Sequence, residues 1–356
     1  MYSQSSRSSP HPLWRWVPWI ERACLVGVGL LALVMLVFIV LYGLRSVGVA
    51  SSLYASFMSG AAWLDYLLGT NVFRHPFMWQ SLATGVLIGI AAPLIGSFLV
   101  HREMALIGET LAHTAFAGVA VGVLLAGVSG WQVGTLLLLS ALAIAVLGAL
   151  GVQWLAAHTR SYGDVPIAIM LSGSFAVGTI LVSYGRGRMA IAIDIEGYLF
   201  GNIAIVTPGG ARLMALITIV TVGVVALAYR QLMFITFDER AARVARINVT
   251  WYNTVLIVTT AIVVVGALQI LGVILVAAMI VVPVAAASQV ARSFRETVRL
   301  SVILGEVSIL IGFAVSVSYG LPSGGSIVVV AIGIYLVAIA VASLQGRSIT
   351  SLAMSS

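Results

Sequence analysis

The sequence predicts an all-α integral membrane protein, a polytopic bundle of about nine or ten transmembrane helices, and three observations support this class. The chain is 61% hydrophobic and 8% charged, whereas soluble domains contain about 25% charged residues. Its mean hydropathy is +1.13. Apolar runs of the roughly 17–25 residues that cross a bilayer follow one another along the chain.

The first 76 residues are expected to form a separate N-terminal unit. Residues 1–22 are polar and then rich in Trp and Arg, which is typical of a cytoplasmic tail that ends at the membrane interface. The apolar run Cys24–Tyr42 predicts a transmembrane helix, because it exceeds the roughly 7–15 residues of a signal-peptide core. A cleaved signal peptide, with a weak site at 48–50, is the alternative. Residues 23–76 then comprise an extra transmembrane helix and, from residue 46, an outer linker.

Nine further apolar runs predict the remaining transmembrane helices. They cover 78–100, 105–127, 132–155, 165–184, 212–230, 252–268, 270–290, 298–318 and 325–344. Residues 187–211 hold two acids, a proline and several glycines, so we expect a re-entrant or non-spanning piece that protein or water must cover. The runs form one domain, 77–345, which is followed by a second cytoplasmic tail, 346–356.

The basic residues indicate how the chain is oriented in the membrane and exclude a nucleotide-binding P-loop. All 18 of them are Arg, and a phosphate-binding P-loop needs a Lys. Any ATP that this protein uses must therefore be hydrolysed by another polypeptide. Thirteen of the 18 fall on the side of the N-terminus, which predicts that both termini are cytoplasmic in a cell membrane. The Arg residues lie in short loops and form no single patch, so the composition does not favour nucleic-acid binding.

The sequence places an acid and an imidazole one helical turn apart inside an apolar run. Glu109 and His113 are four residues apart, so they share a helix face. Ionisable groups in a membrane helix are costly unless they serve a pathway or pair with each other. A carboxylate and an imidazole suit zinc and other divalent first-row metals. A metal route and a structural Glu–His hydrogen bond between helices are both open interpretations.

Other acids are weaker candidates. Glu306 is a second carboxylate inside an apolar run, and it could face the pathway or form a hydrogen bond within the bundle. Asp164 is expected to cap a helix. Asp194 and Glu196 could attract cations at an outer entrance or be solvated loop charges.

Residues 236–248, here called the coupling segment, carry the densest group of charges. Asp238 and Glu239 lie at its start and Arg243 and Arg246 toward its end, an order that suits the dipole of a short helix. Ala241, Val244 and Ile247 recur at helical spacing and predict an amphipathic helix, with Phe237 just before it. This helix could lie on lipid, or it could dock on a cytoplasmic ATPase subunit.

Five segments between about residues 77 and 344 carry family-specific motifs. They read GSFLVHREMALIGETLAHTAFAGVAVG, GYLFGNIAIVTP, FDERAARVARINV, LGVILVAAMIVVPVAAASQVARS and SVSYGLPSGGSIVVV. In this order they resemble the permease subunits of the bacterial and archaeal ABC importers that take up zinc, manganese or iron. The first 76 residues lie outside the resemblance.

The resemblance implies a homodimeric permease that works with two cytoplasmic ATPase subunits and an external metal-binding lipoprotein. It implies that Glu109 and His113 match the family's intramembrane acid and histidine near the metal route, and the sequence around His113 looks closer to the zinc-type members. Some residues depart from the pattern. Glu109 stands where Asp is usual, Asn202 where many members have Asp, and Arg246 where Gly is common, and a histidine near 170–174 is absent.

Taken together, these patterns predict a transport subunit without an ATPase site or cofactor of its own. It would import a divalent transition metal, with zinc favoured over manganese or iron, by alternating access that partner ATPases drive. The alternative is an ion-coupled secondary transporter in which Glu109, His113 and Glu306 relay protons or cations. A membrane scaffold without transport is a third class.

Overall fold

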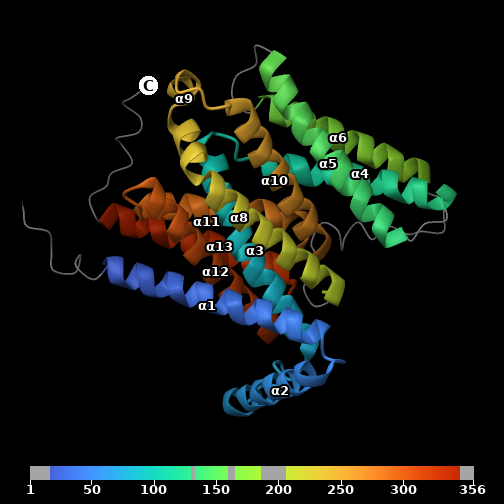
Figure 1. Cartoon of the computed structure of the whole chain (residues 1–356), viewed down its shortest axis with the longest axis vertical. Coiled ribbons are helices and arrows are strands. Elements are labelled where there is room, and N and C mark those ends of the chain that lie inside the picture. The colour runs from blue at the N-terminus through green and yellow to red at the C-terminus, as the bar shows by residue number, and fades with distance from the viewer. Residues whose placement is uncertain (1–16, 130–132, 159–164, 186–205, 345–356) are drawn as a thin grey trace, which may run out of the picture.

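The chain folds into a bundle of α-helices (Figure 1), and the computed structural model describes residues 17–129, 133–158, 165–185 and 206–344. Within these ranges ten helices are long and apolar enough to cross a membrane, so the predicted class is confirmed. The helices are α1 (Val17–Gly43), α2 (Gly48–Leu68), α3 (Pro76–His101), α4 (Ile107–Ser129), α5 (Val133–His158), α6 (Val165–Gly185), α8 (Pro208–Phe237), α9 (Glu239–Val244), α10 (Val249–Leu271), α11 (Val273–Val290), α12 (Phe294–Tyr319) and α13 (Ser323–Leu344).

Each predicted span corresponds to one observed helix, although the ends differ by several residues in places because caps and turns, not hydropathy, set them. The run 212–230, for example, becomes α8, Pro208–Phe237, which Thr207 precedes as N-cap and Asp238 follows as C-cap. The Thr207 side chain accepts a hydrogen bond from the Gly210 backbone and satisfies one of the free N–H groups of the first turn. The predicted re-entrant piece, 187–211, lies outside the described residues except for its last six.

The outer linker expected at 46–76 is largely helical instead. Helix α2 fills residues 48–68 and begins five residues after α1 ends. Its serines and its one acid lower its hydropathy, so it is not among the ten candidate spans. The predicted tail at 1–22 also differs from the structure, because α1 already begins at Val17.

The spans form two groups that α10 and α11 connect. Helix α3 is the most buried span and packs against α1, α8, α11 and α12. Helices α4, α5 and α6 pack against one another and form the green group on one side of Figure 1. Helix α10 contacts α5 and α4 on one side and α8 on the other. Helix α11 contacts α4 as well as α3 and α12, so motion between the two groups must involve both α10 and α11.

Small residues allow close contact between α4 and α5. At Gly118 an added Cβ would lie 2.6 Å from the Cα of Ala141 on α5, and at Gly122 it would collide with the Ser140 hydroxyl. Larger side chains would force α4 and α5 apart, and close backbone approach is a main source of helix association in lipid. The two glycines thus let α4 and α5 pack closely at this contact.

The helix order gives the bundle two distinct ends. The α2 end is where α1 stops, α2 lies and α3 begins; the α9 end is where α3 and α8 stop and α9 lies. Glu21 near the start of α1 forms a 2.9 Å ion pair with Arg299 near the start of α12. Phe294, the first residue of α12, packs its ring 5.0 Å from that of His101 at the end of α3. The start of α1 therefore lies at the α9 end.

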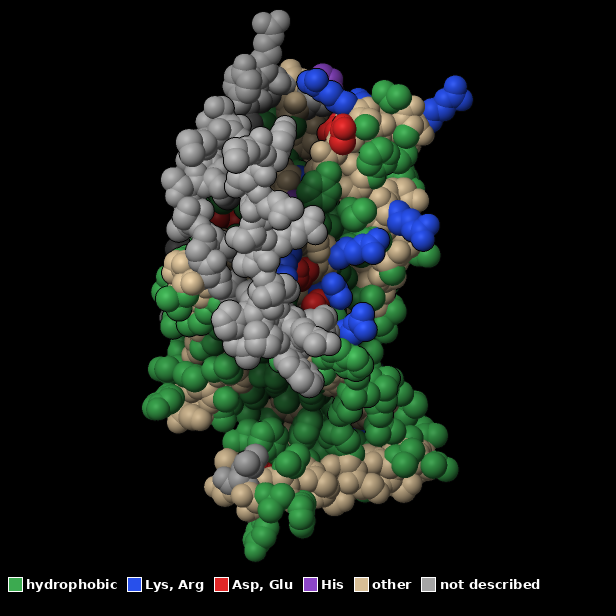
Figure 2. All heavy atoms as spheres, turned by 90° about the vertical axis from the view of Figure 1, so that its left-hand side faces the viewer, with side chains coloured by type: hydrophobic (Ala, Val, Ile, Leu, Met, Phe, Trp, Pro, Cys, Tyr) green, Lys and Arg blue, Asp and Glu red, His purple; other side chains and the backbone are tan. Residues whose placement is uncertain are grey.

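Charged side chains gather toward one end of the molecule. Figure 2 shows Arg together with a few acidic side chains in the upper part of one face, and mostly hydrophobic side chains lower down around α2. Helix α13 packs against α12 and, like α1, has one terminus at the α9 end, so the described chain starts and finishes on the same side.

Candidate functional site

Helix α4 carries the acid and the imidazole that the sequence singles out. Glu109 lies in the first turn of α4, where the helix dipole favours a carboxylate, and His113 lies one turn later. The Nε2 atom of His113 is 3.9 Å from the Oε1 atom of Glu109. That separation is too long for a hydrogen bond, so the two groups are close but not locked to each other.

The pair is open rather than packed away. The Glu109 side chain is 45% exposed and the His113 side chain 17% exposed. The His113 ring meets the edge of Phe175 on α6, with 4.9 Å between the ring centroids. Phe175 also lies beside Phe116 on α4. One aromatic side chain therefore orients the imidazole while the carboxylate stays accessible.

Two ligands do not complete a metal site. No group of three or more His, Cys, Asp or Glu side chains within the described ranges could hold a metal ion. A divalent zinc site usually has four ligands, so water, backbone oxygens or another chain would have to supply the rest. Such an arrangement suits brief binding of an ion on a route rather than permanent storage.

Glu306 lies in a different part of the bundle. It sits midway along α12, is 2% exposed, and faces Gly89 on α3, where an added Cβ would come within 2.6 Å of its Oε1 atom. Both carboxyl oxygens are buried without a hydrogen-bond partner among the described residues. It belongs to no group of metal-binding side chains with Glu109 and His113. Asp164, Asp194 and Glu196 lie outside the described residues.

The coupling segment is a shorter helix than the sequence predicts. Asp238 ends α8, and its side chain accepts a hydrogen bond from the Ala241 backbone, so α9 begins only at Glu239. Arg246 has φ 59°, a left-handed conformation that stops the helix. The N–H of Ile247 donates to the Ala242 carbonyl and that of Arg246 to the Arg243 carbonyl, the hydrogen bonds of a Schellman cap.

The apolar side chains of the coupling segment split into an inner and an outer set, not the single face that Ala241, Val244 and Ile247 predict. Ala242 is buried, and Ile247 packs against it together with Ile235 and Val249. Val244 is 85% exposed and Phe237 is 63% exposed. The exposed pair is available to a docking partner, and Glu239 forms an ion pair with Arg243 beside it.

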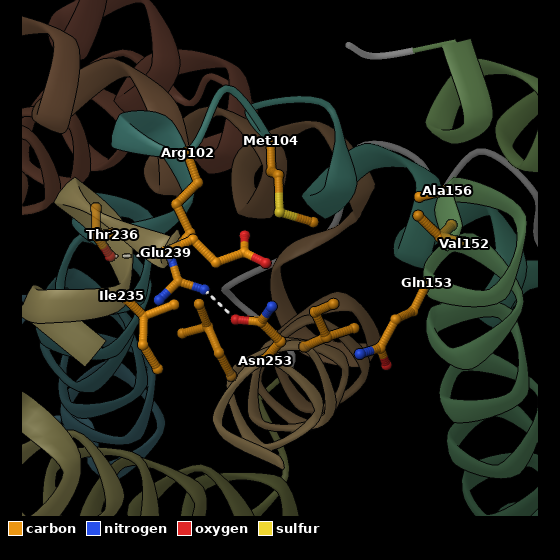
Figure 3. Close-up of a pocket in the computed structure, with 11 residues that line it drawn as sticks. Arg102, Met104, Val152, Gln153, Ala156, Ile235, Thr236, Glu239 and Asn253 are labelled. Carbon is orange, nitrogen blue, oxygen red and sulfur yellow. Dashed lines mark hydrogen bonds between the residues drawn. The ribbon is translucent and has the colours of Figure 1, made fainter. Parts of the chain in front are cut away.

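Sequence reasoning missed the role of Arg102 and the cavity beside it. A cavity of about 370 Å³ opens at the α9 end between α5 and α10. Figure 3 shows Arg102 and Glu239 on one side of it and Gln153 on the other. The lining residues are Arg102, Met104, Val152, Gln153, Ala156, Ile235, Thr236, Glu239, Asn253, Leu256 and Ile257. Arg102 counted in the sequence only as one of the basic residues that set topology.

The chain is a polytopic helix bundle with Arg side chains gathered toward one end, the short helix α9 at that end, and an acid–imidazole pair on one span. These are the features of a membrane transport subunit. The chain matches the ABC 3 transport family over residues 74–342 and belongs to that family. The match confirms the resemblance to metal-uptake ABC permeases that the five sequence segments indicate.

Curated relatives and a solved structure agree with this assignment. The manganese transport system membrane protein MntC of Listeria monocytogenes is 30% identical over 276 residues, covering 78% of this chain and 94% of the relative. The high-affinity zinc uptake system membrane protein ZnuB of Haemophilus influenzae is 24% identical over 252 residues, covering 71% and 92%. A structure titled PsaBC from Streptococcus pneumoniae in complex with Fab aligns with TM-score 0.64 and 27% identity, covering 78% of this chain and 94% of that one.

Proposed function

We propose that this chain is the permease subunit of an ATP-driven importer for a divalent transition metal, manganese or zinc. The observation that carries the proposal is the open Glu109–His113 pair on α4 of an ABC 3 family bundle. A carboxylate and an imidazole bind both Mn²⁺ and Zn²⁺. The sequence around His113 favours zinc, whereas a relative at 30% identity is named for manganese and one at 24% for zinc.

The proposal includes three partners: an ATPase subunit, a second copy of the chain and a lipoprotein that delivers the metal. A cytoplasmic ATPase subunit would dock on Phe237 and Val244 of the coupling segment, since both are exposed and apolar. A second copy of the chain would complete the translocation route, and an external metal-binding lipoprotein would deliver the ion. With the α9 end in the cytoplasm, both termini lie inside, as the Arg distribution favours.

The test is uptake by the permease and its ATPase partner in proteoliposomes, with Mn²⁺ and Zn²⁺ supplied separately. Glu109→Gln and His113→Gln are each expected to lower ATP-dependent uptake about ten- to a hundredfold, the range seen when metal-binding groups are perturbed. Glu296→Gln is the matched control for the carboxylate, because Glu296, like Glu109, lies in the first turn of a helix, and glutamine keeps an oxygen that can accept the hydrogen bond from the Arg292 N–H. His158→Gln, at the exposed end of α5, is the control for the imidazole.

Three results would count against the proposal. Uptake of neither metal by the wild-type complex would end the metal interpretation. Equal uptake by the site variants and their controls would remove Glu109 and His113 from the route. Uptake that follows a proton gradient in the absence of ATP would favour the secondary-transporter alternative.

A further inference from the structure

Arg102 connects three parts of the chain at the α9 end. It follows α3 directly, and its guanidinium reaches two other helices. Its Nε atom donates to the Thr236 hydroxyl at 2.9 Å and its Nη1 atom to the Asn253 side-chain oxygen at 2.6 Å. Its Nη2 atom donates to the Leu232 carbonyl at 3.2 Å. Figure 3 shows Arg102 extended toward Thr236 and Asn253 at the edge of the cavity.

The two helices that Arg102 holds flank the coupling segment. Thr236 is the second-last residue of α8, which ends just before α9, and Asn253 lies in the second turn of α10, which begins just after it. Any displacement of α9 must displace one or both of these helix ends, because only a few residues separate them from α9. Arg102 is therefore attached to both flanks of the element that would contact the ATPase.

On its other side, Arg102 is attached to α4 by a short, fixed turn. Four residues separate it from Ile107, where α4 begins. Glu103 has φ 57°, and the N–H of Met104 donates back to the Leu99 carbonyl at 2.9 Å. This turn leaves little slack, so a shift of Arg102 moves the first turn of α4, which carries Glu109.

The neighbouring residue on α10 makes a second bridge across the cavity. Thr254 donates to the side-chain oxygen of Gln153 on α5 at 3.2 Å. Successive residues of α10 thus hold Arg102 at the end of α3 and Gln153 on α5, and α3 and α5 belong to different packing groups. The cavity between these contacts leaves room for the two groups to change their spacing.

The chemistry of the guanidinium suits this role. Burial lowers the pKa of Arg102 to about 10, and nearby Glu239 opposes that shift, so the group stays charged at neutral pH. A charged planar donor can hold three acceptors in fixed directions, whereas the single ammonium of Lys cannot reproduce that fork. Arg102→Lys therefore keeps the charge and removes the geometry.

We propose that Arg102 is a positioning residue that transmits movement of the coupling segment to α4, and so to the Glu109–His113 pair. This inference rests on the proposed function, because it takes an ATPase as the source of the movement. Arg102 touches neither member of the pair, and it acts through the turn that precedes them.

The first test measures coupling in proteoliposomes that contain the permease and its ATPase partner. Arg102→Lys is expected to lower metal uptake about tenfold, within the range reported for residues that carry coupling between sites. ATP hydrolysis should fall much less, so the ATP consumed per metal ion rises several-fold. Asn253→Leu should act in the same direction and add little to Arg102→Lys. Arg295→Lys, at the exposed start of α12, is the control.

A second test does not depend on transport. Leu106→Cys is placed in a Cys24→Ser background, which leaves one cysteine, and its rate of labelling by a water-soluble maleimide is measured with and without ATP. Leu106 is partly exposed and directly precedes α4. ATP should change the labelling rate when Arg102 is present and should leave it unchanged in Arg102→Lys.

The outcomes separate this inference from the proposed function. ATP-dependent labelling that requires Arg102, without uptake of Mn²⁺ or Zn²⁺, would support the connection and overturn the metal assignment. Loss of uptake and of ATP hydrolysis by the same factor, or labelling that responds to ATP equally in Arg102→Lys, would overturn the connection. Co-purification with the ATPase and an unchanged melting temperature show that each variant is folded.

Discussion

The two ends of the bundle are stabilised in different ways. At the α2 end, aromatic rings of α1, α2 and α3 pack together, with Phe38 5.2 Å from Phe57 and Phe57 4.8 Å from Trp79. At the α9 end, rings of α3 and α8 also pack around Phe294, but beside the cavity the contacts between helices are made by long polar side chains such as Arg102. Dense aromatic packing resists deformation, whereas a few hydrogen bonds around an open space can exchange. The comparison therefore predicts that the α2 end is a fixed base and that movement belongs to the cavity side of the α9 end.

The largest effect is expected from removing Phe38, which lies at the centre of the aromatic cluster at the α2 end, and this variant tests the comparison most directly. Phe38 is fully buried and meets the rings of Tyr42, Tyr54, Phe57 and Trp79. Phe38→Ala is expected to cost about 3–5 kcal/mol of stability, the usual range for such a truncation. Thermal unfolding followed by Trp fluorescence measures the loss.

The control for that variant is Val37→Ala, because Val37 is the neighbour on α1 that points out of the bundle. It should melt close to the wild type. Uptake per folded complex should change little in Phe38→Ala. If uptake falls while the melting temperature stays the same, the α2 end takes part in the moving mechanism and the comparison is wrong.

A smaller effect is expected from the carboxylate that closes the turn between α2 and α3. The Asp65 side chain accepts hydrogen bonds from the Thr70 hydroxyl at 2.8 Å and from the backbone N–H groups of Val72, Phe73 and Arg74. Burial raises the pKa of this carboxyl, but these hydrogen bonds outweigh burial and hold it well below the ordinary value of 3.8. Because the folded pKa is depressed, the stabilisation is complete above about pH 4 and is lost as the pH falls below it.

Asp65→Asn should therefore lower the melting temperature at pH 7, and the difference from wild type should shrink as the pH falls below 3.8. Melting curves of both proteins over this pH range provide the measurement, with Glu103→Gln at the α9 end as the control. A difference that is constant with pH would mean that the charge of Asp65 does not stabilise the turn.

The smallest expected effect concerns the C-terminal cap of α9, and it sharpens the comparison at the α9 end. Arg246 holds a left-handed conformation that glycine adopts without strain. A non-glycine residue in this region costs about 1–3 kcal/mol, and the larger entropy loss of glycine on folding offsets part of that. Arg246→Gly should therefore stabilise the end of α9 by about 1 kcal/mol, seen as slower hydrogen exchange of the Ile247 amide. Arg240→Gly, inside α9, should have the opposite effect, because glycine weakens a helix interior. Faster exchange in Arg246→Gly would mean that the Arg side chain itself holds the cap.

The spans are predictable from sequence because their main determinant, apolar length, is local. Helix α2 is not predictable in the same way. Its residues Tyr54 and Phe57 are fixed by rings from α1 and α3, and these contacts appear only when the three segments meet. The length of α9 depends on the conformation of one residue, Arg246, which residue type would not have predicted.

The same difference between local and long-range determinants applies to the residues of the candidate site. Glu109 and His113 can be found from sequence, because their spacing on one helix places them together. Arg102 cannot, because its partners lie 130 to 151 residues away along the chain. The separation of Glu306 from the pair is likewise visible only in the folded bundle, because the sequence of an apolar run does not show which neighbouring helix its carboxylate faces.

The ion pair between Glu21 and Arg299 bears on how this protein can be shortened for study. A fragment trimmed to the family-matched region, 74–342, would delete the acid and leave a half-exposed guanidinium on α12 without its counter-charge. It would also uncover the apolar flank of α3 that α1 shields. A truncated version should therefore aggregate more readily in detergent than the full-length chain, and replacing Arg299 with a neutral residue should remove only part of that defect.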